Sequence, residues 1–280
     1  MVETPLVSVV VATHNRPQFL KKTIESILRQ SFDRLELIVV SNGFSSTNEQ
    51  VVHCINDSRV TYVAQPNSGG PASPRNHGIR LSKCEYIAFC DDDDLWFPDK
   101  LEKQIKALKA NQDCGICYTR MVRYDDYGNE WTEANDFGPV ATLKSLLFIN
   151  TVPVSSIVVK ADLVRKIGGY SESKRVGLSE DYDFLLKCAT HSVFFLVDEC
   201  LIKYYSGSCR TTMAYETSVI WAVVGTWRYT LGALNCLRLL FGIKSIRNTV
   251  LLRAMLHHLK LCAKRIICLT VLRHVRKLKR

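Results

Sequence analysis

Acidic side chains are absent from the last part of this 280-residue sequence. None follows Glu216, whereas residues 217–280 contain 13 Lys and Arg. The first 216 residues hold 24 basic and 27 acidic side chains, so their net charge is −3 and the +10 of the whole chain comes from the tail. A binding domain that is basic throughout is excluded, and any anionic surface is expected to meet the C-terminal segment.

Proline and glycine are scarce, with 8 and 14 copies, while apolar residues make up 47% of the chain. These values exclude a disordered, collagen-like or low-complexity protein. The first residues lack the features of a secretory signal, so none is expected. The 11 cysteines are odd in number and irregularly spaced, which favours a reducing cytosol over a disulfide framework. Cys114 and Cys117 have the spacing of a metal or redox pair but are expected to pack in the core.

Apolar runs rich in Val and Ile alternate with amphipathic stretches along the first half of the chain. The expected elements are, in order, a strand at 6–12, a helix at 17–30, a strand at 35–40, a helix at 48–56, a strand at 60–64, a helix at 75–82, a strand at 86–90 and a helix from 98. Such alternation predicts an α/β fold with a Rossmann-like, mostly parallel sheet flanked by helices. The less regular second half predicts strands at 116–124, 155–159 and 193–197 and a helix at 179–189.

Polar loops follow three of the predicted parallel strands. Ligands of such sheets bind outside the carboxyl ends of the strands. Residues 13–16, 41–43 and 91–94 should therefore converge on one crevice.

Four consecutive carboxylates, Asp91 to Asp94, come directly after a buried strand. Their mutual repulsion favours the binding of a cation. Alternate side chains of an extended segment point the same way, so Asp91 and Asp93 should act together. A hard cation such as Mn²⁺ or Mg²⁺ commonly joins one or two carboxylates to substrate phosphates. The pattern predicts a site for a divalent cation and a diphosphate; the alternative is an acidic loop that caps the next helix.

A second acidic segment, Ser179-Glu180-Asp181-Tyr182-Asp183, places a Ser cap and three acids in the first turn of a predicted helix. Acids at this position stabilise a helix through its dipole whether or not they have another function. Used chemically, such a carboxylate would act as a general base that takes the proton from an attacking hydroxyl group. The local pattern leaves both interpretations open.

Residues 65–76 combine many turn-forming residues with Arg75, close to a predicted helix start. An Arg side chain binds phosphate through paired N–H groups, and a helix N-terminus attracts anions. An ordinary surface loop is equally consistent with this segment.

Three motifs resemble, in order and separation, those of family 2 glycosyltransferases. They are Val9-Val10-Val11-Ala12-Thr13-His14-Asn15-Arg16, the cluster Asp91 to Asp94 before Leu95-Trp96, and Glu180-Asp181. Three ordered motifs are more specific than any one of them. The resemblance covers approximately residues 5–205. It implies a GT-A fold, a nucleotide-sugar donor and inversion at the anomeric carbon.

The resemblance also implies roles for individual residues. The implied nucleotide-sugar site consists of Thr13, His14, Asn15, Ser41, Asn42, Arg75, Asp91 and Asp92. Asp91 and Asp93 would occupy the Asp-x-Asp positions, with Mn²⁺ or Mg²⁺ as the metal. Asp181 would be the catalytic base, and Glu180 would support the acceptor or the local geometry.

The sequence departs from the family pattern at two places. Ser41-Asn42-Gly43 stands where Asp-Asp-Gly is common, so the carboxylate expected against a uracil ring is absent. The segment from Tyr204 to Ser208 stands where many relatives carry a His that helps to bind metal or diphosphate. Base identity and the remaining metal ligand are therefore left open.

The basic tail has helical spacing. Residues 219–243 are long enough to span a bilayer but contain two Arg. Further on, basic residues recur from Arg253 to Lys264 at spacings of four, three and four, opposite apolar residues such as Leu256. This amphipathic pattern favours attachment to an anionic membrane surface. A spanning or re-entrant segment, and helices packed on the body or on a sister subunit, are the alternatives.

Together these features predict a GT-A glycosyltransferase domain at 1–216 and a basic helical tail at 217–280. We expect a cytoplasmic enzyme, peripheral at the inner face of the cell membrane. It would use a nucleotide sugar, with a UDP-sugar favoured, and a saccharide or lipid-linked glycan acceptor in envelope or surface-polysaccharide synthesis. A polyprenyl-phosphate acceptor and a non-catalytic nucleotide-sugar-binding scaffold are the alternatives, and nucleic-acid binding by the tail ranks last. The donor sugar, linkage and homo-oligomerisation stay open.

Overall fold

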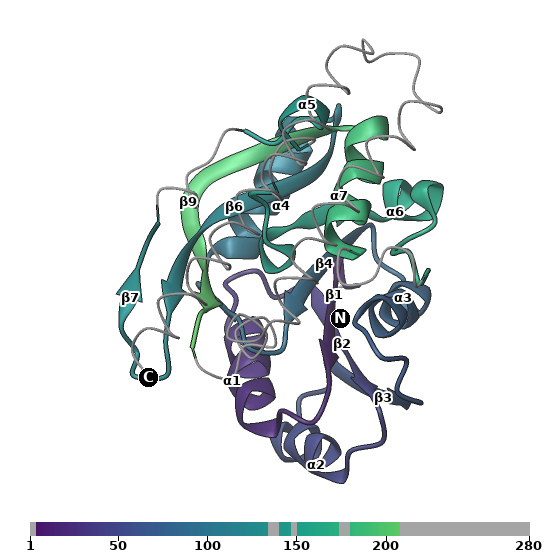
Figure 1. Ribbon diagram of the computed structural model, residues 1–280, viewed down its shortest axis with the longest axis vertical. Helices are drawn as coiled ribbons and strands as arrows, with labels where there is room; N and C mark the ends of the chain where they lie inside the picture. The colour runs from purple at the N-terminus through teal and green to yellow at the C-terminus, as the bar shows by residue number, and fades with distance from the viewer. Residues whose placement is uncertain (1–3, 134–139, 147–149, 174–179, 208–280) are drawn as a thin grey trace, which may run out of the picture.

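The computed structural model describes residues 4–133, 140–146, 150–173 and 180–207 (Figure 1). Within them, nine strands form one sheet in the order β3-β2-β1-β4-β8-β6-β9-β5, with β7 paired to β6. The strands are β1 (Val7–Thr13), β2 (Leu35–Asn42), β3 (Val60–Gln65), β4 (Tyr86–Asp91), β5 (Leu95–Trp96), β6 (Cys114–Tyr124), β7 (Glu130–Trp131), β8 (Val158–Lys160) and β9 (Val193–Tyr205). The helices are α1 (Pro17–Leu28), α2 (Ser46–Ile55), α3 (Ala72–Leu81), α4 (Lys100–Ala110), α5 (Leu143–Leu146), α6 (Ala161–Ile167), α7 (Glu180–His191) and the short 3-10 helix η2 (Val154–Ser156).

The first four long strands form the parallel half of the sheet. β1 pairs in parallel with β2 and β4, and β2 pairs in parallel with β3. The predicted α/β alternation is confirmed here. The register places Thr13 opposite Ser41, and Ala12 opposite Asp91. Because these neighbouring strands end level with one another, the loops that follow them meet at one edge of the sheet.

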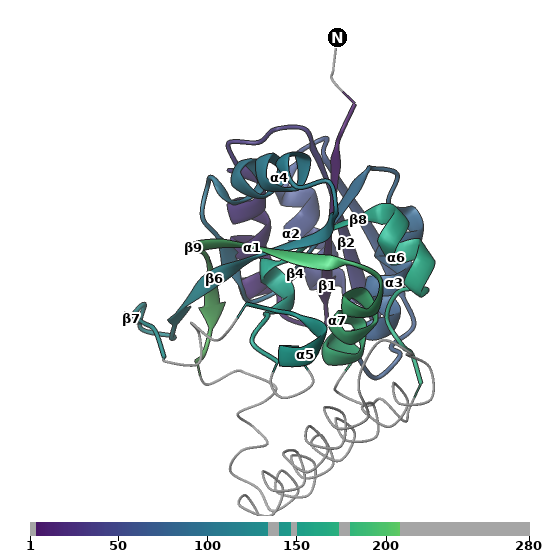
Figure 2. The same cartoon turned by 90° about the horizontal axis from the view of Figure 1, so that it is seen from above.

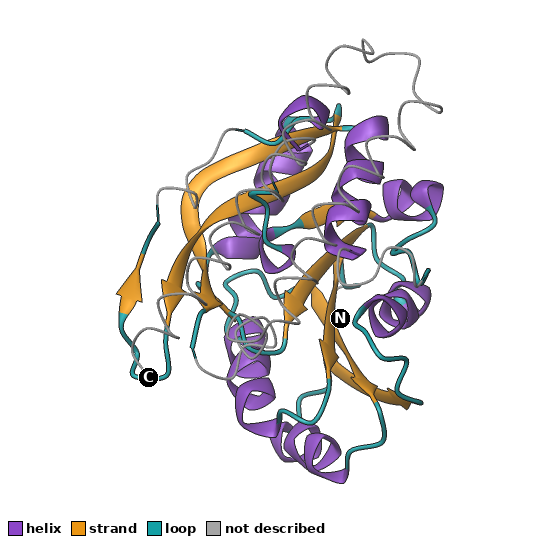
Figure 3. Ribbon diagram, viewed as in Figure 1, coloured by secondary structure: helices purple, strands orange, loops and turns teal. Residues whose placement is uncertain are grey.

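Helices cover both faces of the sheet (Figures 2 and 3). Helices α1, α2 and α4 contribute to the core on one face, and α6 and α7 to the core on the other, with α3 packed against it. The two-residue period of β1 serves both cores. Val9 and Val11 lie in the cluster that contains Leu20 of α1, whereas Val10 lies in the cluster that contains Phe184 of α7. A strand buried on both faces is continuously apolar, which is why β1 was recognisable from its sequence.

The second half differs from the sequence prediction in its details. The strand expected at 155–159 is the later and shorter β8, because η2 forms first, after Pro153, and the hydroxyl of Ser156 donates to the Pro153 carbonyl at 2.7 Å. The strand expected at 193–197 continues to Tyr205, because β9 stays paired with β6 and also pairs with β5. The short elements β5, β7, α5 and α6 were not predicted, because a periodicity does not register over so few residues.

The structure tests the prediction for the cysteine pair but not the prediction for the tail. Cys114 and Cys117 are buried thiols, 8% and 0% exposed, as the core interpretation predicted. The predicted tail at 217–280, its membrane-facing helices and the domain boundary at 216 lie outside the described residues. Among the helices that the structure does describe, none has the length and hydropathy that crossing a bilayer requires.

A lysine is fully buried at the start of α4. Lys100 is 0% exposed, and its Nζ lies 2.7 Å from Oε1 of Gln104 and 3.8 Å from the ring centre of Trp96. The ring face favours the charged ammonium. Burial nevertheless dominates and lowers the pKa of Lys100 to about 7.

Replacing Lys100 with Met should raise stability more at pH 7 than at pH 9. Between pH 7 and the ordinary pKa of 10.5, the unfolded chain retains a proton on Lys100 that the folded chain has released. The unfolded state then binds more protons, so wild-type stability gains from rising pH, by at most about 1.4 kcal/mol per pH unit. Denaturant unfolding at both pH values measures the difference. Lys106→Met, at an exposed position of the same helix, is the control, and a gain independent of pH would contradict the prediction.

Candidate active site

The carboxyl end of β1 leads into α1 through a tight loop. Thr13 ends the strand, and Pro17 is the first residue of the helix, where the missing N–H of proline would be unpaired anyway. Between them, Asn15 has a φ of 51°, a left-handed conformation that Asn tolerates better than most residues. His14 and Asn15 are exposed. Of the residues that the family resemblance assigns to base binding in this loop, His14 and Asn15 are thus presented at the sheet edge, whereas Thr13 is buried.

The four consecutive carboxylates alternate between two environments. Asp92 and Asp94 are 6% and 1% exposed. The side chains of Asp91 and Asp93 are 36% and 14% accessible. The expected extended segment was wrong, because β4 ends at Asp91 and a turn follows, closed by the N–H of Asp94 on the Asp91 carbonyl at 3.2 Å. The pair predicted to bind a cation is nevertheless the more accessible pair of the cluster.

The buried carboxylate Asp94 holds the loop together. One of its oxygens accepts the hydroxyl of Ser155 at 2.5 Å, and the other accepts the backbone N–H of Tyr205 at 2.9 Å. The hydroxyl of Thr23 lies 3.0 and 2.9 Å from the carbonyl oxygens of Asp92 and Asp94. These contacts serve the loop itself rather than the N-terminus of α4, whose cap residue makes no side-chain capping bond. Tyr205, near the position of the family's His, here has a structural contact.

Arg16 joins the two middle carboxylates. Its Nη1 donates to Oδ2 of Asp93 at 2.7 Å and to Oδ1 of Asp92 at 3.2 Å. The second oxygen of Asp92 accepts the hydroxyl of Thr13 at 2.7 Å. Burial, with repulsion from the adjacent acids, raises the pKa of Asp93 to about 7 against the attraction of Arg16. Arg16 belongs to the first sequence motif, but sequence reasoning assigned it no role.

Arg75 connects the two acidic segments. Its side chain is 6% exposed; Nη2 donates to Asp91 at 2.6 Å and Nη1 donates to Glu180 at 3.0 Å. Burial alone would lower the pKa of Arg75, but the negative charges around it outweigh burial and raise it. Burial, followed by repulsion from Asp181, raises the pKa of Glu180, while Arg75 opposes that shift. The structure thus brings together Arg75, Asp91 and Glu180, three residues assigned to the site from sequence.

Glu180 and Asp181 begin α7 in different surroundings. Glu180 is 6% exposed and its carboxylate contacts Arg75. Asp181 is partly exposed, and its Oδ1 accepts the N–H of Tyr182 at 2.7 Å. Ser179, the predicted cap, lies outside the described residues. Of the two acids, Asp181 is the more exposed.

The polar side chains of the Ser41-Asn42 turn are hydrogen-bonded to other groups of the protein. Ser41 is 0% exposed. The amide of Asn42 donates to the carbonyl of Gly70 at 3.1 Å and accepts the N–H and hydroxyl of Ser68 at 2.9 and 3.0 Å. The backbone carbonyl oxygen of Asn42 lies 2.5 Å from Nδ1 of His14. A carbonyl only accepts, so Nδ1 carries the proton and Nε2 of the neutral ring is an acceptor. The structure places these residues beside one another, with His14 exposed among them.

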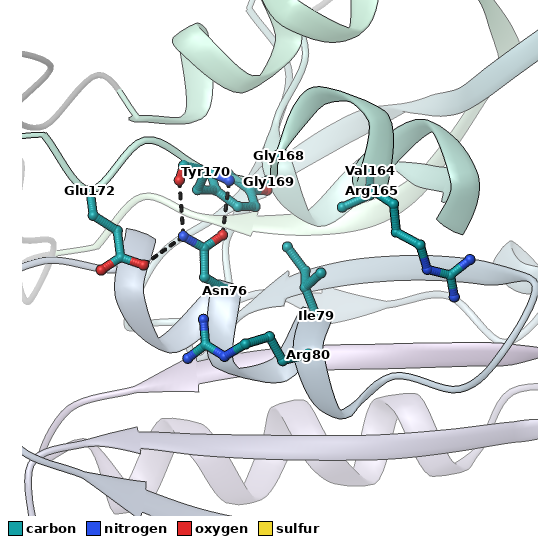
Figure 4. Close-up of a pocket in the computed structure, with 9 residues that line it drawn as sticks. All are labelled: Asn76, Ile79, Arg80, Val164, Arg165, Gly168, Gly169, Tyr170 and Glu172. Carbon is teal, nitrogen blue, oxygen red and sulfur yellow. Dashed lines mark hydrogen bonds between the residues drawn. The ribbon is translucent and has the colours of Figure 1, made fainter.

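Asn76, which follows Arg75 on α3, clamps the turn after α6 (Figure 4). Its Nδ2 donates to the carbonyl of Tyr170 at 2.9 Å and to Glu172 at 2.7 Å, and its Oδ1 accepts the N–H of Tyr170 at 2.9 Å. Gly169 has a φ of 69°, and a Cβ there would come within 2.6 Å of Oδ1 of Asn76. The clamp lies at a pocket of about 470 Å³ between α3 and α6.

The clamped Tyr170 supports Arg75. Its ring centre lies 5.2 Å from the guanidinium carbon of Arg75, and the ring stacks on Phe184 of α7 at 4.2 Å. The sequence signal for this support was the Asn that follows Arg75. Its partner was not recognisable, because Asn76 and Tyr170 are far apart in the chain.

The family resemblance implies a divalent cation, and Asp91 and Asp93 fit one that arrives with a diphosphate. Among the described residues, no group of three or more His, Cys, Asp or Glu side chains is arranged to hold a metal without help. Mg²⁺ and similar cations typically take one or two carboxylates and complete their coordination with phosphate oxygens and water. Two partly exposed carboxylates at one sheet edge meet that requirement.

A mostly parallel sheet that gathers an Asp-x-Asp pair and a helix-starting Glu-Asp pair at its carboxyl edge defines a GT-A glycosyltransferase. The model of Glycosyl transferase family 2 matches residues 8–158, and the chain belongs to this family. An uncharacterized glycosyltransferase of Methanocaldococcus jannaschii is 32% identical over 212 residues, which cover 72% of this chain and 71% of that protein. WcaA of Escherichia coli, provisionally assigned to colanic acid biosynthesis, is 38% identical over 103 residues, 36% of this chain and 37% of WcaA.

Solved structures confirm the GT-A fold. S. aureus TarS 1-349 in complex with UDP-GlcNAc has a TM-score of 0.69 and 17% identity, with 91% of this chain and 71% of that chain covered. Mannosyltransferase PcManGT from Pyrobaculum calidifontis, in complex with GDP-Man and Mn²⁺, has a TM-score of 0.66 and 16% identity, with 96% of this chain and 76% of that chain covered.

Proposed function

We propose that the protein transfers a sugar, with inversion, from a nucleotide diphosphate sugar to a saccharide or lipid-linked glycan acceptor. The bridge made by Arg75 carries this proposal. Its guanidinium binds Asp91, at the end of β4, at 2.6 Å and Glu180, at the start of α7, at 3.0 Å. The acids assigned to the donor and those assigned to the base therefore lie within the reach of one side chain.

The surroundings of each acid support a division of labour. Asp181 takes the proton of the acceptor hydroxyl as that oxygen attacks the anomeric carbon; the bond to the diphosphate oxygen breaks on the opposite face, so the configuration inverts. Glu180, which is buried against Arg75, positions the guanidinium beside the diphosphate. A divalent cation held by Asp91 and Asp93 would stabilise the negative charge of the departing nucleoside diphosphate.

A UDP-sugar is the favoured donor. TarS is described in complex with UDP-GlcNAc, whereas the Pyrobaculum mannosyltransferase is described with GDP-Man. In this chain the side chain of Asn42 is already occupied by Ser68 and Gly70. The base must then be distinguished by other groups, among which His14 is exposed at the same edge.

Calorimetry with UDP, GDP and their sugars, with and without Mn²⁺, tests the donor assignment. One nucleotide should bind in a Mn²⁺-dependent manner, and Asp93→Ala should weaken that binding at least about tenfold, because a carboxylate ligand is lost. Asp162→Ala, at a 95% exposed acid on α6, is the matched control and should bind like the wild type. Absence of binding across the panel would refute the proposed activity.

The acceptor is proposed to belong to surface-polysaccharide synthesis. The partial likeness to WcaA supports this choice over a polyprenyl phosphate. Product analysis with a saccharide, a lipid-linked glycan and a polyprenyl phosphate separates the three. Transfer to polyprenyl phosphate alone would replace the proposal with the alternative.

We further propose that the tail at 217–280 holds the enzyme at an anionic membrane surface on its cytoplasmic side. The full-length protein should co-sediment with vesicles containing anionic lipid and dissociate as salt rises. Replacing Arg253, Lys260 and Lys264 with Gln should weaken binding. Gln at three exposed lysines of the body, Lys21, Lys106 and Lys109, should not. Preferential binding of RNA or DNA in competition with the vesicles would favour a nucleic-acid role instead.

A further inference from the structure

Arg16 forms an ion pair with Asp93, the carboxylate that is a metal ligand in the proposed function. Its Nη1 lies 2.7 Å from Oδ2 of Asp93, and the two side chains are 22% and 14% accessible. The same nitrogen lies 3.2 Å from Asp92, whose side chain is 8% accessible. Two adjacent carboxylates thus share one guanidinium.

A divalent cation and this guanidinium cannot share Asp93 without strong repulsion. A cation that bound Asp93 would lie within a few ångströms of Nη1, where like charges repel strongly in a partly buried site. Arg16 would then have to give up Asp93. Its backbone would stay in place, because its carbonyl accepts the N–H groups of Phe19 and Leu20 at the start of α1 at 3.2 and 3.0 Å. The exchange therefore needs movement of the side chain alone.

The surroundings suggest where the guanidinium goes. Arg16 immediately precedes α1, whose N-terminus follows the carboxyl end of β1 and lies at the sheet edge where Asp91 ends β4. A diphosphate bound there with the cation would carry the negative charge that Arg16 loses at Asp93. An arginine binds such a group through two N–H donors, as it does a carboxylate.

We propose that Arg16 is an exchangeable counter-ion, which neutralises Asp93 in the ligand-free enzyme and passes to the diphosphate when a divalent cation takes Asp93. The inference rests on the proposed function and adds a residue that neither the resemblance nor the sequence reasoning assigned. Arg75 does not suit this role, since its side chain is 6% exposed and is held by two carboxylates on separate elements.

The exchange predicts that Arg16→Gln changes two affinities in opposite directions. Mn²⁺ alone should bind at least about fivefold more tightly to Arg16→Gln, because the competing positive charge is gone. UDP, added at saturating Mn²⁺, should bind at least about fivefold more weakly, because its diphosphate loses a partner. Titration of full-length protein at pH 8.5, followed by the electron paramagnetic resonance signal of unbound Mn²⁺ and by calorimetry for UDP, measures both.

Two further variants make the test specific. Arg29→Gln, at the C-cap of α1 and at a 69% exposed position paired with Glu25, should leave both affinities unchanged. Arg16→Lys, which keeps the charge but loses the paired donors, should leave Mn²⁺ binding near the wild-type value and weaken UDP binding.

The possible results separate the exchange from the function on which it rests. If the wild type binds no UDP in the presence of Mn²⁺, the proposed function fails and the exchange fails with it. If the wild type binds UDP with Mn²⁺ and Arg16→Gln binds Mn²⁺ alone no more tightly than the wild type does, while circular dichroism shows an intact fold, Arg16 is a structural clamp and the exchange is wrong. Tighter Mn²⁺ binding with unchanged UDP binding would overturn the transfer to the diphosphate.

Discussion

Asp181→Asn is expected to reduce sugar transfer about 100- to 10,000-fold and to leave nucleotide binding unchanged. Asn has nearly the same shape as Asp, and its oxygen can still accept the N–H of Tyr182 that Oδ1 accepts at 2.7 Å. It cannot take a proton at neutral pH, so the contribution of a general base is lost. Initial rates with a saturating donor, together with the calorimetric affinity for UDP and Mn²⁺, measure the two effects separately.

The controls distinguish a missing base from a damaged fold. Asp162→Asn, on the exposed side of α6, should retain full activity. Glu180→Gln should weaken nucleotide binding as well as turnover, because it loosens Arg75. Activity retained by Asp181→Asn would place the base elsewhere. A wild-type protein that binds donors but transfers no sugar to any acceptor would support the non-catalytic scaffold.

Arg75→Met is expected to lower the free energy of unfolding by about 3–5 kcal/mol. The variant leaves Glu180, whose side chain is 8% accessible, without its counter-ion, and removal of one partner from a buried ion pair costs about this much. It also removes the group that rests against the ring of Tyr170. Denaturant unfolding measures the loss, and Arg165→Met, at a 59% exposed position paired with Asp162, should change stability little.

The stability lost in Arg75→Met should be smaller at pH 5 than at pH 8. The pKa of Glu180 is raised above 4.5 in the folded protein even with Arg75 present. The folded state therefore binds more protons than the unfolded state just above pH 4.5, and stability falls as pH rises through the raised pKa. Without Arg75 the pKa rises further, so this loss extends to higher pH. A deficit equal at both pH values would contradict the assignment of Glu180 as the unpaired charge.

The parallel half of the fold was predictable because its signals are local. Val9, Val10 and Val11 are buried on alternate faces of one strand, so the run is apolar throughout. The end of β9 was not predictable, since what keeps the chain extended as far as Tyr205 is pairing with β5 and β6. Such pairing depends on residues remote in sequence, which a local pattern does not report.

The site was predictable as a set of residues but not as a network. The Asp91-to-Asp94 cluster is recognisable at the end of an apolar strand, but the turn that sets the exposure of Asp93 is not a strand and was not predicted. The partners of Arg16 and Arg75 were not predictable either, because both guanidinium groups could have faced solvent. The prediction that Ser41 and Asn42 hold the base did not include their hydrogen bonds to neighbouring backbone groups and to Ser68. These bonds depend on how two loops pack against each other, which a local sequence pattern does not report.

The hydrogen bond between Arg75 and Glu180 joins positions 105 residues apart. During synthesis, β1 to β4 and their helices can pair as soon as they emerge, since their contacts are comparatively local. Arg75 would then remain incompletely compensated until α7 has been made and docked. Competence to bind a donor therefore comes late in maturation, and nucleotide binding would serve as a reporter of finished folding. Truncated chains that end before α7 should therefore not bind nucleotide.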